Sequence, residues 1–423
     1  MKLNNKQTLN CHHPEQSDKS KLTTACYHGG DFFQAIGEEF NSLERRHEII
    51  NADVLDAWFP PSPRVLAALN EDLPWLLRTS PPANCEGLTH VLARSRGVSP
   101  GSILPAAGSS DAIFLAFRHW LTPSSRVLIL DPTYGEYGHV LERVIGCRVI
   151  RLPLLRDDNY RVNLDELKQL SRCNYDLIAL VNPNSPTGQH VPRKELEIFL
   201  RRVPSSTLVW VDETYVEYAG AGESLERFAA KSKNVIVCKS MSKVYALSGV
   251  RAAYLCGPEQ IVSDLRGITP PWAVSLPAQV AAVAALHDPD YYAGRYLQTH
   301  QLRAQLAEEL ATVTDWEIVP GIANFLLCHL PENSQTVAEI SKRCRLQNLF
   351  LRDVGSMGRS FGGRALRIAV KDAETNGRMV EILSRVLAEH SSPFTKNGST
   401  RDKNRGLTAR PIQFTTQVTS HRP

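Results

Sequence analysis

The chain has 423 residues, of which 43% are hydrophobic and 22% are charged, and its formal net charge is +4. A chain of this length can bury the cores of a large and a small domain, and its composition is typical of a globular protein. So slight a charge predicts no nucleic-acid partner, and no apolar run approaches the roughly 18 residues that a membrane-spanning helix needs.

The nine cysteines are scattered singly and form no CxxC pair. This pattern favours reduced thiols in a cytoplasmic enzyme over a disulfide framework or a zinc site. Residues 1–25 are polar and lack the apolar segment of a secretory signal, so we expect a flexible leader and a cytoplasmic location. Cys11, His12 and His13 suggest a metal site, but no second cluster of ligands follows them, and we predict none.

The first motif after the leader is a Tyr-His-Gly-Gly-Asp sequence that begins at Tyr27 and includes His28 and Gly29. A helical pattern follows and ends near Arg46. On its residues alone the motif is a turn with a helix-capping residue. We assign residues 1–51 to an N-terminal leader and arm.

Short apolar runs alternate with helical patterns from Gly87 to about His287, which predicts βα units around a mainly parallel sheet. The shortness and hydrophobicity of these runs favour strands that are covered on both faces. Clear examples are residues 126–130, 147–152, 177–181, 208–211, 235–238 and 252–255.

Beyond Asp288 the pattern changes to a long amphipathic helix through Leu310, and shorter strands and helices follow to about residue 390. We therefore predict an α/β protein with a large domain over residues 52–287 and a smaller α+β domain over residues 288–390. Residues 391–423 are rich in Ser, Thr, Lys, Arg and Gly and hold few apolar side chains, so we expect a disordered tail.

The chain is organised around residues 235–251, where an apolar run ends in a turn that holds Lys243 between small residues. Because a buried ammonium is costly and its pKa falls readily, a lysine in this setting either has chemistry to perform or is an ordinary lysine of a surface turn. Ser240, Ser242 and Arg251 flank it and could bind an anion with two hydroxyls and a two-pronged guanidinium.

A second anion-binding pattern is Gly108-Ser109-Ser110, which follows an apolar run and opens a helical pattern through Trp120. The free N–H groups and the dipole at the start of a helix attract anions, and a glycine lets the backbone approach closely. The same residue types also occur in an ordinary N-cap turn.

Asp212 and Tyr215 follow the apolar run at residues 208–211. A carboxylate at the carboxyl edge of a strand can hold a pyridine nitrogen protonated, although acidic pairs after strands are also common helix caps. The segment from Asn182 to Gly188 contains two prolines and a glycine at a spacing that fixes a turn.

Taken together and in this order, these motifs resemble the pyridoxal-phosphate aminotransferases of fold type I. The resemblance is to the branch that contains histidinol-phosphate aminotransferase and threonine-phosphate decarboxylase, and it extends over about residues 52–387. It implies a large domain with a seven-stranded, mainly parallel sheet. It also implies pyridoxal 5′-phosphate as the cofactor, a small-molecule amino acid substrate and a homodimer.

The resemblance implies roles for individual residues as well. Lys243 would bind the cofactor aldehyde and move the Cα proton of the substrate, Asp212 would hold the pyridine nitrogen, and Tyr134 would stack on the ring. In the family an asparagine before Pro-Thr-Gly donates to the ring oxygen, and this chain offers Asn184 or Ser185 for that contact. The implied cofactor-binding residues are Gly108, Ser109, Ser110, Tyr134, Asn184, Ser185, Asp212, Tyr215, Ser240, Ser242, Lys243 and Arg251.

The substrate-binding residues are also implied by the resemblance. His28 and Gly29 match a His-Gly-Gly that meets the substrate phosphate in threonine-phosphate decarboxylases. Arg367 resembles the arginine that clamps the substrate α-carboxylate, and Arg352 resembles one that reaches the distal group. Asn324 lies in a segment that lines the site or packs nearby in the family. Both arginines could also be strand residues whose guanidinium reaches solvent.

The chain departs from the family at two places. Trp58-Phe59-Pro60 stands in place of the usual Asn-Glu-Asn-Pro, and Thr79 or Ser80 stands in place of a tyrosine that reaches the cofactor phosphate of the neighbouring subunit. We predict a transaminase of a small amino acid or amino acid derivative. The alternatives are decarboxylation of a phosphorylated amino acid, which the His-Gly-Gly motif suggests, and a non-catalytic binding protein of the same fold.

Overall fold

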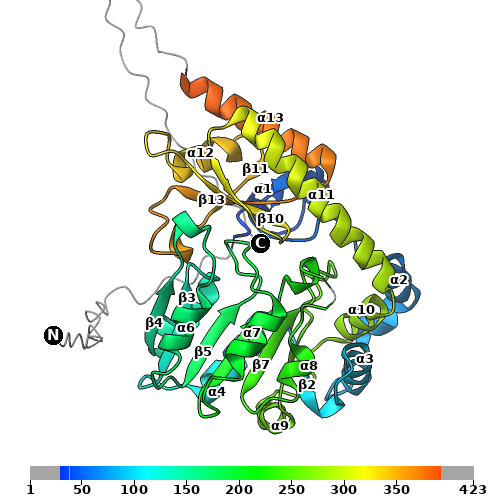
Figure 1. The fold of residues 1–423 in the computed structure, drawn as a ribbon. Coiled ribbons are helices and arrows are strands. Elements are labelled where there is room, and N and C mark those ends of the chain that lie inside the picture. Colours follow the sequence, from blue (N-terminus) through cyan, green and yellow to red (C-terminus); the bar gives the residue numbers. More distant parts are fainter. Residues whose placement is uncertain (1–28, 38, 221, 392–423) are drawn as a thin grey trace, which may run out of the picture.

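The computed structural model describes residues 29–37, 39–220 and 222–391. Within them a seven-stranded sheet carries helices on both faces, and a four-stranded sheet lies above its edge in the view of Figure 1. The predicted leader, His28 and the tail beyond residue 391 lie outside the described residues.

The large sheet has the strand order β2-β8-β7-β6-β5-β3-β4. Neighbouring strands are parallel except at β8, which is antiparallel to both β2 and β7. The prediction of a mainly parallel sheet in an α/β fold is therefore confirmed. The strands are β2 (Ile103–Ala106), β3 (Arg126–Asp131), β4 (Arg148–Pro153), β5 (Leu177–Val181), β6 (Leu208–Asp212), β7 (Val235–Ser240) and β8 (Ala253–Cys256).

Alternate residues of the strands enter two separate hydrophobic cores, one on each face of the large sheet. In β3, Leu128 and Leu130 pack in the core that includes α6 and α7, whereas Val127 and Ile129 pack in the core that includes α4 and α9. Because both faces are covered, the strands read as continuous apolar runs rather than alternating ones. These helices are α4 (Ser109–Trp120), α6 (Leu164–Leu170), α7 (Arg193–Leu200) and α9 (Glu259–Ile268).

The smaller sheet is antiparallel and has the order β12-β13-β10-β9. The long helix predicted after Asp288 is α11 (Pro289–Val313), which packs against α13 (Ala373–Ser391). The strands are β9 (Glu317–Val319), β10 (Phe325–His329), β12 (Arg352–Asp353) and β13 (Ala365–Ala369), and α12 (Val337–Arg345) lies between β10 and β12 in the chain.

The remaining elements connect the sheets or cover their edges. The helices are α1 (Phe32–Ile36), α2 (Pro63–Arg78), α3 (Glu86–Arg96), α5 (Gly135–Gly138), α8 (Glu226–Ala229) and α10 (Leu276–Leu286). Short 3-10 helices occur at Leu43–His47, Pro100–Ser102, Arg156–Asp158, Val216–Tyr218 and Gly355–Met357, and a π-helix occurs at His139–Ile145.

The chain just before the large domain is joined to the small domain instead. β1 (Ile50–Asn51) pairs in parallel with β11 (Leu349–Phe350). Ala52 N then donates to Phe350 O at 2.9 Å, and Ala369 N donates to Ala52 O at 3.1 Å. The residues after Ala52 are thereby held beside β13, and the proposed domain limits at residues 51–52 and 287–288 stay predictions.

The helix expected from Asp31 to Arg46 is not continuous. α1 ends at Ile36, because Gly37 adopts φ 108°, a conformation that favours glycine and ends the helix. A 3-10 helix follows only at Leu43–His47. The sequence pattern therefore overestimated the length of this helix.

In the described part of the chain, no helix is long and apolar enough to cross a membrane. The same residues contain no group of three or more His, Cys, Asp or Glu side chains that could hold a metal ion. Cys11, His12 and His13 lie outside them.

Candidate active site

A cavity of about 130 Å³ lies where the carboxyl ends of the parallel strands open into loops. Ten of its twelve lining residues were predicted cofactor contacts, so the structure brings together residues that are distant in the sequence. Thr214 and Val181 complete the lining. The ten are Ser109, Ser110, Tyr134, Ser185, Asp212, Tyr215, Ser240, Ser242, Lys243 and Arg251.

Gly108 and Arg251 form a positively charged surface at the start of α4. Gly108 is the N-cap residue of α4 and adopts φ 99°. An added Cβ there would lie 2.3 Å from Arg251 Nη2, so only glycine lets the guanidinium approach the helix N-terminus this closely. Helix N–H groups and an adjacent arginine together suit a phosphate group.

Lys243 lies in the cavity with its amine engaged by an unpredicted partner. Its Nζ donates to Asp56 Oδ1 at 3.0 Å and to Ser248 Oγ at 3.5 Å. Burial lowers the pKa of Lys243, Asp56 opposes this shift, and the nearby charges of Arg367 and Arg251 add to it. The lowered pKa increases the neutral fraction of the amine, the form that can act as a nucleophile or base.

Asp212 ends β6 and is fixed by three hydrogen bonds. Its Oδ2 accepts from Tyr137 Oη at 2.8 Å, and its Oδ1 accepts from Thr214 N at 3.0 Å and Thr214 Oγ1 at 2.7 Å. Tyr137 Oη in turn accepts from Trp210 Nε1 at 2.8 Å. Burial raises the pKa of Asp212, while the hydrogen bonds lower it. Its orientation is therefore set by two neighbouring elements.

Asn184 and Ser185 differ in what they contact. The buried Asn184 amide donates to Pro132 O and Thr187 Oγ1, each at 3.1 Å, and it does not line the cavity. Ser185 lines the cavity, and its Oγ accepts from Arg367 Nη1 at 3.1 Å. Of the two alternatives left open by the sequence, Ser185 faces the site and Asn184 holds the turn.

Arg367 and Tyr215 pack around Phe325 at the side of the small domain. The Arg367 guanidinium lies 5.5 Å from the Phe325 ring centroid, and its Nη2 donates to Asp53 O at 3.2 Å. Tyr215 meets the same ring edge-on at 5.5 Å. Burial lowers the pKa of Arg367 to about 10, and Tyr215 opposes the shift.

Arg352 and Gly29 both lie next to Asp53, and none of the three residues lines the cavity. Arg352 Nη1 lies 3.5 Å from Asp53 Oδ1, and Gly30 N donates to Asp53 Oδ2 at 3.1 Å. An added Cβ at Gly29, which has φ 89°, would lie 2.6 Å from the same carboxylate. The glycines therefore allow this close approach, while His28 lies outside the described residues.

Asn324 is fully buried and does not line the cavity. Its Nδ2 donates to Leu55 O at 3.0 Å. This contact places Asn324 against the segment that carries Asp56, so of the two positions left open by the sequence it packs near the site rather than lining the cavity.

Sequence reasoning missed Asp56, Thr214 and Tyr137. Asp56 lies in the segment whose family motif is absent, so no pattern marked it, although an acidic residue close to that motif was a usable signal. Thr214 is two residues after Asp212, a spacing at which hydroxyl and N–H groups commonly bond a carboxylate. Tyr137 is three residues after Tyr134, but nothing in the sequence linked it to Asp212.

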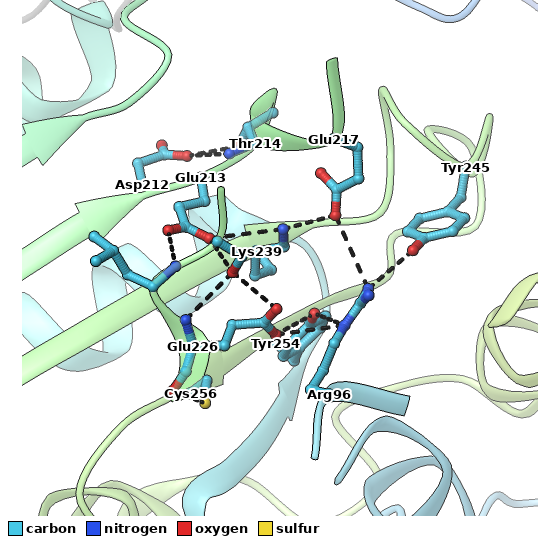
Figure 2. Close-up of polar contacts among 12 residues, drawn as sticks. Arg96, Asp212, Glu213, Thr214, Glu217, Glu226, Lys239, Tyr245, Tyr254 and Cys256 are labelled. Atoms are coloured by element: carbon cyan, nitrogen blue, oxygen red, sulfur yellow. Dashed lines mark hydrogen bonds and ion pairs between the residues drawn. The ribbon is translucent and has the colours of Figure 1, made fainter. Parts of the chain in front are cut away.

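A buried group of charges surrounds Lys239 of β7, the strand next to the one that carries Asp212, and we call it the Lys239 cluster (Figure 2). Lys239 Nζ lies 2.6 Å from Glu217 Oε1 and 3.7 Å from Glu213 Oε2. Arg96 Nε lies 3.5 Å from Glu226 Oε1. A second cavity, of about 780 Å³, borders the cluster and contains none of the predicted site residues. The cluster consists of Arg96, Glu213, Glu217, Glu226 and Lys239.

The cavity residues fit a phosphate-bearing pyridine aldehyde. Arg251 and the N-terminus of α4 suit the phosphate, the Lys243 amine suits the aldehyde, and the Asp212 carboxylate suits a protonated ring nitrogen. Tyr134 supplies an aromatic face in the same cavity.

Comparisons with known proteins agree with this geometry. A family model described as aminotransferase class I and II matches residues 60–383. A histidinol-phosphate aminotransferase of Anaeromyxobacter sp. is 30% identical over 356 residues, which cover 83% of this chain and 95% of that relative.

Two solved structures share the fold. The histidinol-phosphate aminotransferase from Sinorhizobium meliloti, in complex with pyridoxal-5′-phosphate, has a TM-score of 0.74 and 24% identity, covering 87% of this chain and 99% of its own. The L-threonine-O-3-phosphate decarboxylase from Porphyromonas gingivalis has a TM-score of 0.70 and 23% identity, covering 80% and 100%. With the family match over most of its length, the chain belongs to the aminotransferase class I and II family and is a pyridoxal-phosphate-dependent aminotransferase.

Proposed function

We propose that the enzyme transaminates a small amino acid or amino acid derivative, as its histidinol-phosphate aminotransferase relatives do, and that Lys243 is its catalytic lysine. One observation carries the proposal: the Lys243 amine lies in a single cavity with Asp212 and the Ser240–Arg251 turn. When bound, pyridoxal 5′-phosphate supplies an electron sink for the negative charge that develops at the substrate Cα.

Lys243 and Asp212 divide the proton chemistry between them. The lowered pKa of Lys243 leaves part of its amine neutral, so Nζ can accept the proton from the substrate Cα and return it elsewhere. The Asp212 carboxylate is held by Tyr137 and Thr214, and it would keep a bound pyridine nitrogen protonated. Both groups are ordered before a substrate binds, which lowers the cost of reaching the reactive geometry.

Arg367 is the proposed clamp for the substrate α-carboxylate. Its guanidinium is buried, stands over Phe325, and directs Nη1 at the cavity residue Ser185. A carboxylate can take the place of the serine hydroxyl in a two-pronged contact, which is stronger because it is charge-assisted.

Replacement of the lysine tests the proposal. We expect Lys243→Ala to remove the visible absorbance band of the lysine-bound cofactor and to reduce turnover at least about a thousandfold, because acid–base catalysis alone contributes about 10²–10⁴. Lys231→Ala, at an exposed lysine outside the cavity, is the matched control and should keep both. Full activity in Lys243→Ala would refute the assignment, as would borohydride trapping of the cofactor on another side chain.

A second candidate, decarboxylation of a phosphorylated amino acid, is suggested by the His-Gly-Gly motif. Gly30 N donates to Asp53 Oδ2, so this segment lies beside Arg352, whose Nη1 is 3.5 Å from Asp53 Oδ1. The test of this candidate is a screen of amino acids and phosphorylated amino acids. Formation of the amine form of the cofactor supports transamination, whereas release of carbon dioxide without a keto-acid requirement supports decarboxylation.

We further propose a cytoplasmic homodimer. The described cysteines are free, which suits a reducing compartment. Apolar side chains are exposed on α2, at the end of α9 and shortly after it, where a second copy of the chain would cover them; they are Leu66, Leu73, Trp75, Leu77, Ile268 and Trp272.

A further inference from the structure

Asp56 and Lys371 are brought together by hydrogen bonds through one residue, Asn324. Asn324 Nδ2 donates to Leu55 O at 3.0 Å, and Asn324 O accepts from Val370 N at 2.9 Å. Leu55 is thereby bonded to the side chain of Asn324, and Val370 is bonded to the backbone of the same residue. The residues that follow them, Asp56 and Lys371, therefore lie near each other at the junction of the two domains.

Asp56 reaches from this position to the proposed catalytic lysine. Its Oδ1 accepts from Lys243 Nζ at 3.0 Å. Burial raises the pKa of Asp56, but the charges of Lys243 and Lys371 and a hydrogen bond from Ser248 outweigh it, so the net shift is downward. The Asp56 carboxylate therefore bonds the Lys243 amine and is also stabilised by the charge of the Lys371 amine.

Lys371 has no close partner of its own within the described residues. Its amine makes no hydrogen bond or ion pair with any residue that the structure describes, although Lys371 is only partly exposed. Burial lowers the pKa of Lys371 to about 8; Asp56 opposes the shift and the charge of Lys243 adds to it. An amine in this environment acts on its neighbours through its charge rather than through a bond.

The charged groups that act on these three side chains come from four segments of the chain. They are Asp56, Lys243, Arg251, Arg367, Lys371 and Asp372.

We propose that Asp56 is a carboxylate shared by two lysines: it holds the Lys243 amine while that amine is free, and it is balanced by Lys371 when Lys243 is bonded to the cofactor. In this arrangement Asp56 and Lys371 are positioning residues. Asp56 keeps the released amine at the site, and the charge of Lys371 prevents Asp56 from holding that amine permanently as an ammonium ion. The inference rests on the proposed role of Lys243.

The arrangement makes opposite predictions for the two partners. In the enzyme with its cofactor, Lys371→Gln leaves the Asp56 carboxylate unbalanced, so protonation of the nitrogen that Lys243 contributes becomes easier. Asp56→Asn leaves Lys371 unbalanced and makes that protonation harder. At a distance of a few ångströms in a partly buried site, each shift should be about one pH unit.

The test is a pH titration of the visible absorbance band of the lysine-bound cofactor. We expect its midpoint to rise in Lys371→Gln, to fall in Asp56→Asn and to return toward the wild-type value in the double variant. Lys371→Arg keeps the charge and should titrate close to the wild type. Lys342→Gln removes an exposed lysine of the same domain and should leave the midpoint unchanged.

A second measurement reports on the free amine itself. In the full chain freed of cofactor, the pH dependence of Lys243 acetylation gives the pKa of that amine by peptide mass analysis, including in any variant that retains cofactor poorly. We expect this pKa to fall in Asp56→Asn and to rise in Lys371→Gln.

Three results would overturn the proposal without touching the role of Lys243. One is an identical titration midpoint in the wild type and in all Asp56 and Lys371 variants, while Lys243→Ala still loses the absorbance band. Another is a shift of the same sign in Asp56→Asn and Lys371→Gln. The third is a rise in KM in Lys371→Gln with an unchanged titration, which would assign Lys371 to substrate binding.

Discussion

Asn184 and Ser185 are consecutive residues with separate tasks. The sequence could place a turn at this position, because two prolines and a glycine restrict the backbone. It could not say which polar side chain faces the site, since that depends on the backbone path through the turn. Asn184 is held by Pro132 O and Thr187, which leaves Ser185 beside Arg367.

This division predicts different outcomes for two neighbouring alanine variants. Asn184→Ala removes a buried amide and leaves Pro132 O without that donor, so it should lower the free energy of unfolding by about 1–3 kcal/mol. Ser185→Ala should leave stability nearly unchanged and raise KM for the amino acid substrate several-fold, because Arg367 loses an oriented contact. Urea unfolding and steady-state kinetics on both variants check this. Equal stability losses in the two would contradict the division.

The sequence could predict some charged residues of the site but not others. Lys243, Asp212 and Arg251 could be predicted because each belongs to a motif with a fixed spacing. Asp56 could not, because its partner is 187 positions away and only the fold brings them within 3.0 Å. Arg352 does not line the cavity, and its Nη1 lies 3.5 Å from Asp53 Oδ1, a contact that the sequence did not predict.

At the scale of elements, β6 and β7 each deliver one site residue and one residue of the Lys239 cluster. Asp212 and Glu213 are adjacent at the end of β6, and Glu213 turns into the cluster while Asp212 bonds Thr214 (Figure 2). Lys239 lies four residues before Lys243. The strands were predictable from their apolar runs, but a buried lysine within such a run gave no sign of the three acids around it.

The cluster predicts a pH dependence of stability. Burial raises the pKa of Glu213 from 4.5 to about 7, while Lys239 opposes the shift. The folded state therefore keeps a proton that the unfolded state releases, so the stabilisation from this group is complete below pH 4.5 and is lost as the pH rises through about 7.

We expect Glu213→Gln to reduce this loss by at most about 1.4 kcal/mol per pH unit, as measured by urea unfolding between pH 5 and 8. Glu226→Gln is the matched control. Burial raises the pKa of Glu226, but Arg96 and Lys239 outweigh it and the net shift is downward, so its removal acts with the opposite sign and at lower pH. Parallel stability curves for the wild type and Glu213→Gln would exclude Glu213 as the titrating group.

At the scale of the whole molecule, a segment outside the seven-stranded and four-stranded sheets connects the small domain to the candidate site. Residues 50–51 pair with β11, and the residues that follow bring Asp53 to Arg352 and Asp56 to Lys243. The sequence predicted the mainly parallel large sheet from its short, continuous apolar runs, which the structure confirms. The sequence could not predict that residues 50–51 pair with the small domain, since a two-residue strand is too short to show a pattern.

α2 carries apolar side chains on the surface of the molecule. Val65 and Leu76 are buried in the fold, while Leu66 lies before and Leu73 and Leu77 lie after a kink at Asp72, and all three are exposed. Trp272 is also exposed, and its backbone N–H donates to Ala83 O in the segment that follows α2. Exposed apolar side chains that the fold itself does not cover are typical of a subunit interface.

We therefore expect Leu77→Glu combined with Trp272→Glu to convert the proposed dimer into monomers at micromolar concentration, because each change would bury a charge in an apolar contact. Light scattering coupled to size-exclusion chromatography measures the mass directly. Leu346→Glu changes a leucine that is 82% exposed next to α12 and should leave the mass unchanged. If the double variant keeps the mass of the wild type, α2 and Trp272 lie outside the interface, and their apolar side chains require a different partner.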